Sequence, residues 1–167
     1  MARSSKLKSN WRRMEWQELV HSVRTMIAAV ASLLLARLFR LPESYWAAIT
    51  AMIVMQSTLG AALAISKQRL AGTALGAAMG ALFATFIGRS ITVYGVGIFM
   101  CGVICAVLRT ERSAYRYAGI TLTIVMLIAH SQPAWIIAIH RFTEISLGII
   151  VGLLLTAVWP EPRATAI

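Results

Sequence analysis

The sequence predicts an all-α membrane protein with six transmembrane helices, and both its composition and its apolar patterning support that prediction. Its 167 residues are 59% hydrophobic and 13% charged, and their mean hydropathy is +0.74. Soluble domains contain about 25% charged residues, and a soluble fold of this length could not bury so much apolar surface. Backbone groups within lipid must be hydrogen-bonded inside their own segment, so the spans are expected to be helices.

The apolar residues fall into six stretches, most of which reach the ~17–25 residues that a bilayer span needs. Their approximate bounds are 23–41, 45–65, 69–87, 91–108, 114–130 and 134–159. The first stretch is the weakest, because Arg24, Arg37 and Arg40 must reach the headgroups or face protein. If this segment lay on the membrane surface, five spans would remain and the symmetry discussed below would fail.

The chain divides into a basic N-terminal segment (1–22), a transmembrane domain (23–160) and a short cytoplasmic tail (161–167). Between residues 11 and 22, Trp11 and Trp16 alternate with charged side chains, which is typical of an amphipathic helix at the membrane interface. Alternatively, the two tryptophans anchor the start of the first span.

The distribution of basic residues predicts the orientation of the chain. Six spans place both termini on one side, and twelve of the sixteen Lys and Arg residues fall on that side. Cytoplasmic loops carry the excess of basic residues, so both termini are expected in the cytoplasm. The net charge of +10 then reflects this bias and the anionic headgroups of the bilayer, and a nucleic-acid partner is not expected.

A weak internal repeat relates the two halves of the chain. A shift of 72 residues aligns Arg69-x-x-Gly72-x-x-Leu75-Gly76-x-x-x-Gly80 with Arg141-x-x-Glu144-x-x-Leu147-Gly148-x-x-x-Gly152, and a shift of 71 aligns 49–55 with 120–126. The first and fourth stretches show no convincing match. Three helices per repeat would insert the halves in opposite directions, as in many transporters. Chance matching between apolar segments is the alternative.

Glycines recur every four residues in the third and sixth stretches, at Gly72, Gly76 and Gly80 and at Gly148 and Gly152. This spacing places them on one helix face, where small residues allow close helix packing. The alternative is a wall of small residues beside a permeating molecule.

Three charged residues are candidates for a functional site. Arg69 opens the third stretch and Arg141 lies about seven residues inside the sixth, near opposite membrane faces in an inverted arrangement. An arginine close to a helix N-terminus attracts anions and can bind a carboxylate through two hydrogen bonds. Arg69 could instead be an interfacial cation that only sets the topology.

Glu144 lies three residues after Arg141, so the two share a helix face. Charges at membrane depth are costly unless they are paired or hydrated. Either the two pair structurally, or they border a water-filled path in which Glu144 takes up a proton.

The second stretch ends in a polar group at Gln56, Ser57 and Thr58, which could line a path or satisfy the helix end. Cys101 and Cys105 are expected to be packing residues. No nucleotide-binding loop, metal-ligand cluster or nucleophile–base pair is present in the sequence, so no enzyme activity, metal or cofactor is expected.

Three segments together resemble the fusaric acid resistance, or aromatic acid exporter, family. They are Pro42-Glu43-Ser44-Tyr45-Trp46-Ala47-Ala48-Ile49-Thr50, Val54-Met55-Gln56-Ser57-Thr58-Leu59-Gly60-Ala61 and Lys67-Gln68-Arg69-Leu70-Ala71-Gly72-Thr73. The sixth stretch, from Arg141 to Trp159-Pro160, fits the same family.

The resemblance implies an inner-membrane exporter of organic anions, chiefly aromatic carboxylic acids, driven by the proton gradient. It also implies a distant relation to the aluminium-activated malate transporters, which are dimeric anion channels. Arg69, Arg141, Gln56 and Thr73 would bind substrate, and Glu144 would serve in proton coupling or gating.

Larger members of that family carry a cytosolic region or a second membrane domain, so a homo-oligomer is expected here. A passive anion channel and a non-transporting membrane subunit remain alternatives.

Overall fold

The computed structural model describes residues 2–56, 58–128 and 132–160, with side chains described from residue 16 onward, and helices are the only regular secondary structure within these residues. The helices are α1 (Ala2–Leu38), α2 (Tyr45–Val54), α3 (Leu59–Phe86), α4 (Ile91–Val107), α5 (Arg112–Leu127) and α6 (Ala134–Val158). The expectation of an all-α fold is therefore confirmed.

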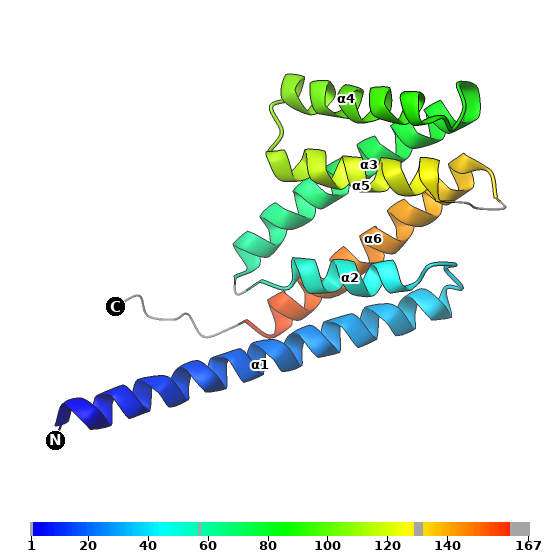
Figure 1. The fold of residues 1–167 in the computed structure, drawn as a ribbon. Helices are drawn as coiled ribbons and strands as arrows, with labels where there is room; N and C mark the ends of the chain where they lie inside the picture. The colour runs from blue at the N-terminus through cyan, green and yellow to red at the C-terminus, as the bar shows by residue number, and fades with distance from the viewer. Residues whose placement is uncertain (1, 57, 129–131, 161–167) are drawn as a thin grey trace.

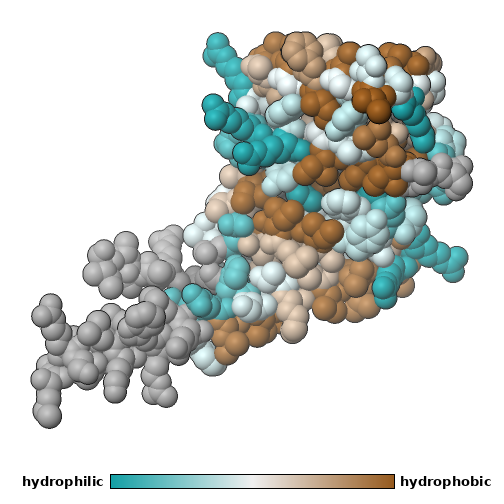
Figure 2. All heavy atoms as spheres, in the orientation of Figure 1, coloured by the Kyte–Doolittle hydropathy of each residue, from teal (hydrophilic) through white to brown (hydrophobic). Residues whose placement is uncertain are grey.

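Helices α3 and α6 cross the centre of the bundle and run in opposite directions (Figure 1). Helix α5 packs on α3, and α2 packs on α6. Helices α1 and α4 lie at opposite edges, where α1 contacts α2 and α6, and α4 contacts α5 and α3. Hydrophobic side chains dominate the middle of the visible surface, and most hydrophilic ones gather toward its two ends (Figure 2).

Three helical segments among the described residues are long and apolar enough to cross a membrane: Trp16–Leu38, Leu59–Phe86 and Ala134–Val158. Helix α2 has 10 residues and α4 has 17. At 1.5 Å per residue, α2 is about 15 Å long, which is half of a bilayer's ~30 Å hydrocarbon core. Six full-length spans are therefore not confirmed.

The expected second span at 45–65 is divided in the structure, because the helix ends at Val54 and a new one begins at Leu59. Thr58 caps α3 by accepting a hydrogen bond from the backbone N–H of Ala61 at 3.3 Å. The Gln56 side chain donates to the carbonyl of Ile53 at 3.1 Å, so it satisfies the end of α2. Ser57 lies outside the described residues.

Helix α1 is continuous across the boundary predicted at residue 22. Its buried face is formed by Arg24, Ala28, Ser32 and Ala36, which recur every four residues and are each 0% exposed. Arg24 therefore faces protein rather than headgroups, whereas Arg37 and Arg40 are exposed. The predicted tail, 161–167, lies outside the described residues.

The repeated glycines lie where backbones meet. A Cβ added to Gly76 would lie 2.2 Å from the carbonyl oxygen of Ala118 in α5, and one added to Gly148 would lie 2.3 Å from that of Ala47 in α2. Gly72 faces α5 in the same way as Gly76, while Gly80 and Gly152 face valines of α5 and α2. These contacts leave no room for side chains, so α3 packs directly on α5 and α6 on α2.

We expect Gly148→Ala to lower the free energy of unfolding by about 1–3 kcal/mol, because the new methyl group must displace the α2 backbone. Thermal unfolding in detergent measures the effect. Gly95→Ala is the matched control, because an added Cβ there meets nothing within 4 Å. Equal melting temperatures for the two variants would contradict the packing described here.

Candidate functional site

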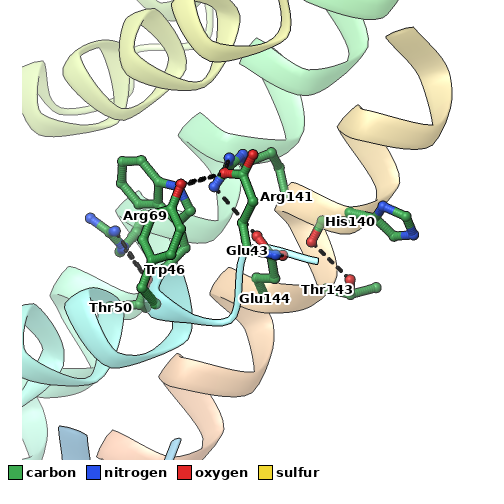
Figure 3. A network of polar contacts seen from close by, with 9 residues as sticks. Glu43, Trp46, Thr50, Arg69, His140, Arg141, Thr143 and Glu144 are labelled. Carbon is green, nitrogen blue, oxygen red and sulfur yellow. Dashed lines mark hydrogen bonds and ion pairs between the residues drawn. The ribbon is translucent and has the colours of Figure 1, made fainter. Parts of the chain in front are cut away.

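A buried cluster of charged and polar side chains lies where α3 and α6 pass α2 (Figure 3). Arg69 is 4% exposed, Arg141 is 2% and Glu144 is 1%, while Thr50 is fully buried. Charges buried within a membrane protein are costly unless other groups compensate them. The partners of each charge therefore indicate what the cluster can do.

Arg141, in α6, is bound by two carboxylates. It forms an ion pair with Glu43, which lies just before α2, and a 3.4 Å contact with Glu144 one turn further along α6. Its guanidinium carbon lies 4.7 Å from the ring centroid of Trp46, a cation–π distance. The backbone N–H of Glu43 donates to Glu144 at 2.9 Å, which joins the start of α2 to α6.

Two aromatic side chains of α2 hold the Glu43 carboxylate in place. The Tyr45 hydroxyl donates to it at 2.7 Å, and the indole N–H of Trp46 donates at 3.2 Å. Glu43 is thus fixed by local hydrogen bonds as well as by its ion pair.

Arg69, in α3, has a different environment. Its Nε and Nη2 donate to the hydroxyl of Thr50 at 3.2 and 3.0 Å, and its guanidinium carbon lies 4.9 Å from the ring centroid of Tyr117 in α5. Among the described residues no carboxylate forms an ion pair with it. Its positive charge is therefore buried without an ionic partner in that part of the chain.

Two further hydroxyls lie on the same face of α3, three residues before and four residues after Arg69. Ser66 is 5% exposed and Thr73 is 1% exposed, and neither hydroxyl has a hydrogen-bond partner within the described part of the chain. Buried polar groups are normally hydrogen-bonded. The face around Arg69 can therefore still donate hydrogen bonds to an acceptor.

The two parts of the cluster carry opposite formal charge. The part around Arg69 carries a single positive charge. Arg141 with Glu43 and Glu144 carries one negative charge in excess when both carboxylates are ionised. An anion suits the first part, and a proton would neutralise the second.

Contacts in the two parts recur at the spacing of the sequence repeat. Arg69 lies over Tyr117, and Arg141, 72 residues later, lies over Trp46, which is 71 residues before Tyr117. The glycine contacts follow the same rule, because Gly76 meets Ala118 and Gly148 meets Ala47.

The structure changes the positions expected for the two arginines. Arg69 lies ten residues inside α3 and does not open it, because Thr58 starts the helix earlier. The argument from helix N-termini therefore does not apply to this residue. The two arginines also lie close together rather than at opposite ends of the bundle, since they contact Trp46 and Thr50, one turn apart on α2 (Figure 3).

Of the other residues considered for the site, one lies in the cluster and the others lie outside it. Thr73 lies on the Arg69 face, whereas Gln56 caps the end of α2. The His140 ring points away from the cluster, as Figure 3 shows.

Sequence reasoning assigned no role to Glu43, Trp46, Thr50 or Tyr117. Glu43 could have been found from the scarcity of acidic residues, of which the chain has only six. Tyr117 could have been found by extending the repeat from Trp46.

Comparison with known proteins gives one family. The model of the fusaric acid resistance protein-like family matches residues 28–155. "Inner membrane protein YeeA" of Escherichia coli K12 is 26% identical over 145 residues, which cover 86% of this chain and 41% of the relative. "Uncharacterized transporter YdhK" of the same strain is 28% identical over 170 residues, which cover 94% of this chain and 25% of the relative.

The YdhK protein of Salmonella typhimurium LT2 is 28% identical over 154 residues, which cover 84% of this chain and 22% of the relative. The chain thus spans less than half the length of these relatives. No solved protein structure matches it. The resemblance inferred from the sequence motifs is confirmed.

We expect Glu43→Gln to lower the free energy of unfolding by about 1–3 kcal/mol, because buried Arg141 would lose one of its two charged partners. The apparent melting temperature of the purified protein measures this loss. Glu18→Gln is the control, because Glu18 is exposed on α1. If both variants melt like the parent protein, the ion pair does not stabilise the fold.

Proposed function

The chain belongs to the fusaric acid resistance protein-like family, and on that premise we propose that it exports organic anions, aromatic carboxylic acids in particular, across the inner membrane in exchange for protons. The observation that carries the proposal is the burial of Arg69 without a carboxylate partner in the described residues. An ionisable group of this kind inside a membrane bundle is a functional-site candidate. A carboxylate matches the planar donor geometry of a guanidinium.

Substrate binding involves the α3 face. The carboxylate of the anion approaches the guanidinium of Arg69, and Thr73 and Ser66, whose hydroxyls have no partner among the described residues, donate from the neighbouring turns. Tyr117 offers an aromatic surface beside the same guanidinium, and its 4.9 Å cation–π contact supports this arrangement. Gln56 is also assigned to substrate binding, although its side chain donates to the Ile53 carbonyl at the end of α2 in this structure.

Proton coupling is assigned to Glu144 together with Glu43 and Arg141. One cation faces two carboxylates, so a single proton neutralises this part of the cluster. Trp46 contacts Arg141 and Thr50 contacts Arg69 from adjacent turns of α2. A shift of α2 that follows protonation would therefore reach the anion site directly.

The fold is proposed to consist of two inverted halves, α1–α3 and α4–α6, with both termini cytoplasmic. Exchanging the halves leaves the set of helix contacts unchanged, because α1–α2 becomes α4–α5 and α3–α5 becomes α6–α2. In Figure 1 each helix runs opposite to its counterpart, and α6 ends at the end of the bundle from which α1 rises.

The ends of α1 and α4 support the pairing of these two helices as counterparts in the two halves. Their sequences showed no convincing match. Each helix closes with a backbone hydrogen bond of 3.0 Å, from Leu41 N–H to Ala36 and from Thr110 N–H to Cys105. Each closing turn contains an arginine with positive φ, 54° at Arg40 and 51° at Arg109. Both endings are Schellman motifs, so the counterpart helices α1 and α4 end in the same way. We also propose that the chain forms a homo-oligomer, as its resemblance to the family implies.

We expect Arg69→Gln to reduce efflux of an aromatic carboxylate at least tenfold, because the variant removes a buried cation that has no carboxylate partner among the described residues. Transport into inverted vesicles containing the purified chain measures this effect. Arg89→Gln is the control, because Arg89 is exposed between α3 and α4. Undiminished transport by Arg69→Gln would reject Arg69 as the anion site.

We expect Glu144→Gln to abolish the dependence of transport on the pH gradient while anion exchange across the membrane continues. The glutamine retains an oxygen that accepts from the Glu43 N–H, so the geometry is preserved while the titratable group is lost. Flux with and without an imposed pH gradient distinguishes the two activities. A passive channel would show flux independent of the pH gradient in the parent protein, and that result would count against proton exchange.

A further inference from the structure

A surface groove between the end of α4 and the start of α5 lies outside the cluster of Arg69 and Arg141. Its volume is about 440 Å³, which is within the range of small-ligand sites. Its lining includes Phe99, Gly102, Val103 and Ala106 from α4 and Arg112 and Tyr115 from α5. One wall is thus apolar, and the mouth is polar.

Gly102 keeps the groove open. A Cβ added there would lie 3.4 Å from the ring of Tyr115, so the absence of a side chain leaves free space beside the ring. A larger residue at this position would occupy the groove and leave the charges at its mouth unchanged.

The mouth of the groove is positively charged. Arg112 lines it, and Arg109 and Arg116 lie three and four residues away along the chain. All three are exposed, and no carboxylate of the described residues forms an ion pair with them. Arg112 and Arg116 are one turn apart, so they share a face of α5. Glu111 also lines the groove, but its carboxylate accepts a hydrogen bond from the Gln68 side chain of α3, which draws it toward the bundle.

The surface along α4 changes from apolar to basic at this point. Phe99 is 68% exposed, Val103 is 40% and Val107 is 75%, and the three arginines follow within about two turns. Figure 2 shows hydrophilic side chains gathered where α4 passes into α5, beside the hydrophobic surface of α4. Such a change matches the boundary between the hydrocarbon core and the headgroups.

We propose that this groove binds one anionic phospholipid, with an acyl chain along α4 and the phosphodiester headgroup on Arg112 and Arg116. Guanidinium groups bind phosphate oxygens through paired hydrogen bonds. A soluble anion would use the arginines but would leave the apolar wall uncovered, which favours a lipid. This site is independent of the proposed export activity, because it shares no residue with the central cluster.

Native mass spectrometry of the full chain in detergent, with added phosphatidylglycerol or phosphatidylcholine, tests the proposal. We expect retention of one phosphatidylglycerol in preference to phosphatidylcholine. The double variant Arg112→Ala with Arg116→Ala should weaken retention about 25-fold, at about fivefold for each arginine. Gly102→Leu should also weaken retention with all charges intact, and Arg89→Ala should leave it unchanged.

Three results would overturn the proposal. The first is equal retention of the two lipids by the parent protein. The second is unaltered retention by Gly102→Leu, which would reduce the effect to surface charge. The third is displacement of the lipid by inorganic phosphate at matched ionic strength, which would identify a site for phosphate alone.

Thermal unfolding of each variant verifies that the fold is intact. If the leucine variant does not fold, Gly102→Ala fills the groove with a smaller side chain.

Discussion

The close approach of helix backbones at the repeated glycines is the constraint on which the rest of the molecule depends. A Cβ on Gly72 would lie 2.8 Å from the Cβ of Tyr117, and one on Gly148 would lie 2.7 Å from the Cβ of Thr50. These glycines share helix faces with Arg69 and Arg141. The same contacts that join α3 to α5 and α6 to α2 therefore bring the arginines against the aromatic rings and the threonine of their neighbours. The close glycine contacts therefore determine both the packing of the helices and the position of the polar cluster.

The two arginines occupy similar packing environments but have opposite electrostatic ones. Both lie over an aromatic ring, at 4.9 and 4.7 Å, yet among the residues that the structure describes only Arg141 forms ion pairs with carboxylates. Gly72 stands in α3 at the position that Glu144 occupies in α6. In the proposed arrangement one half carries the anion site and the other the proton site, because the two carboxylates of Glu43 and Glu144 change the charge around the arginine from one positive to one negative.

Sequence reasoning identified the helical class, the family, the glycine faces and the pair formed by Arg141 and Glu144. It misplaced the start of α3, because Lys67-Gln68-Arg69 was interpreted as a polar boundary between two spans. In the structure the helix continues through these residues, since Gln68 donates to Glu111 and Arg69 donates to Thr50. Both partners come from distant parts of the chain. Hydropathy along the sequence cannot supply such contacts, and the role of Glu43 was missed for the same reason.

Binding of an aromatic carboxylate to the purified protein is the most direct measurement of the central claim, that the buried Arg69 receives the anion. Calorimetric titration can compare benzoate with benzamide, which has the same ring and no negative charge. We expect the parent protein to bind benzoate in clear preference to benzamide, and Arg69→Gln to lose that preference. Equal binding of the two compounds by the parent protein, or an unchanged preference in Arg69→Gln, would contradict the claim.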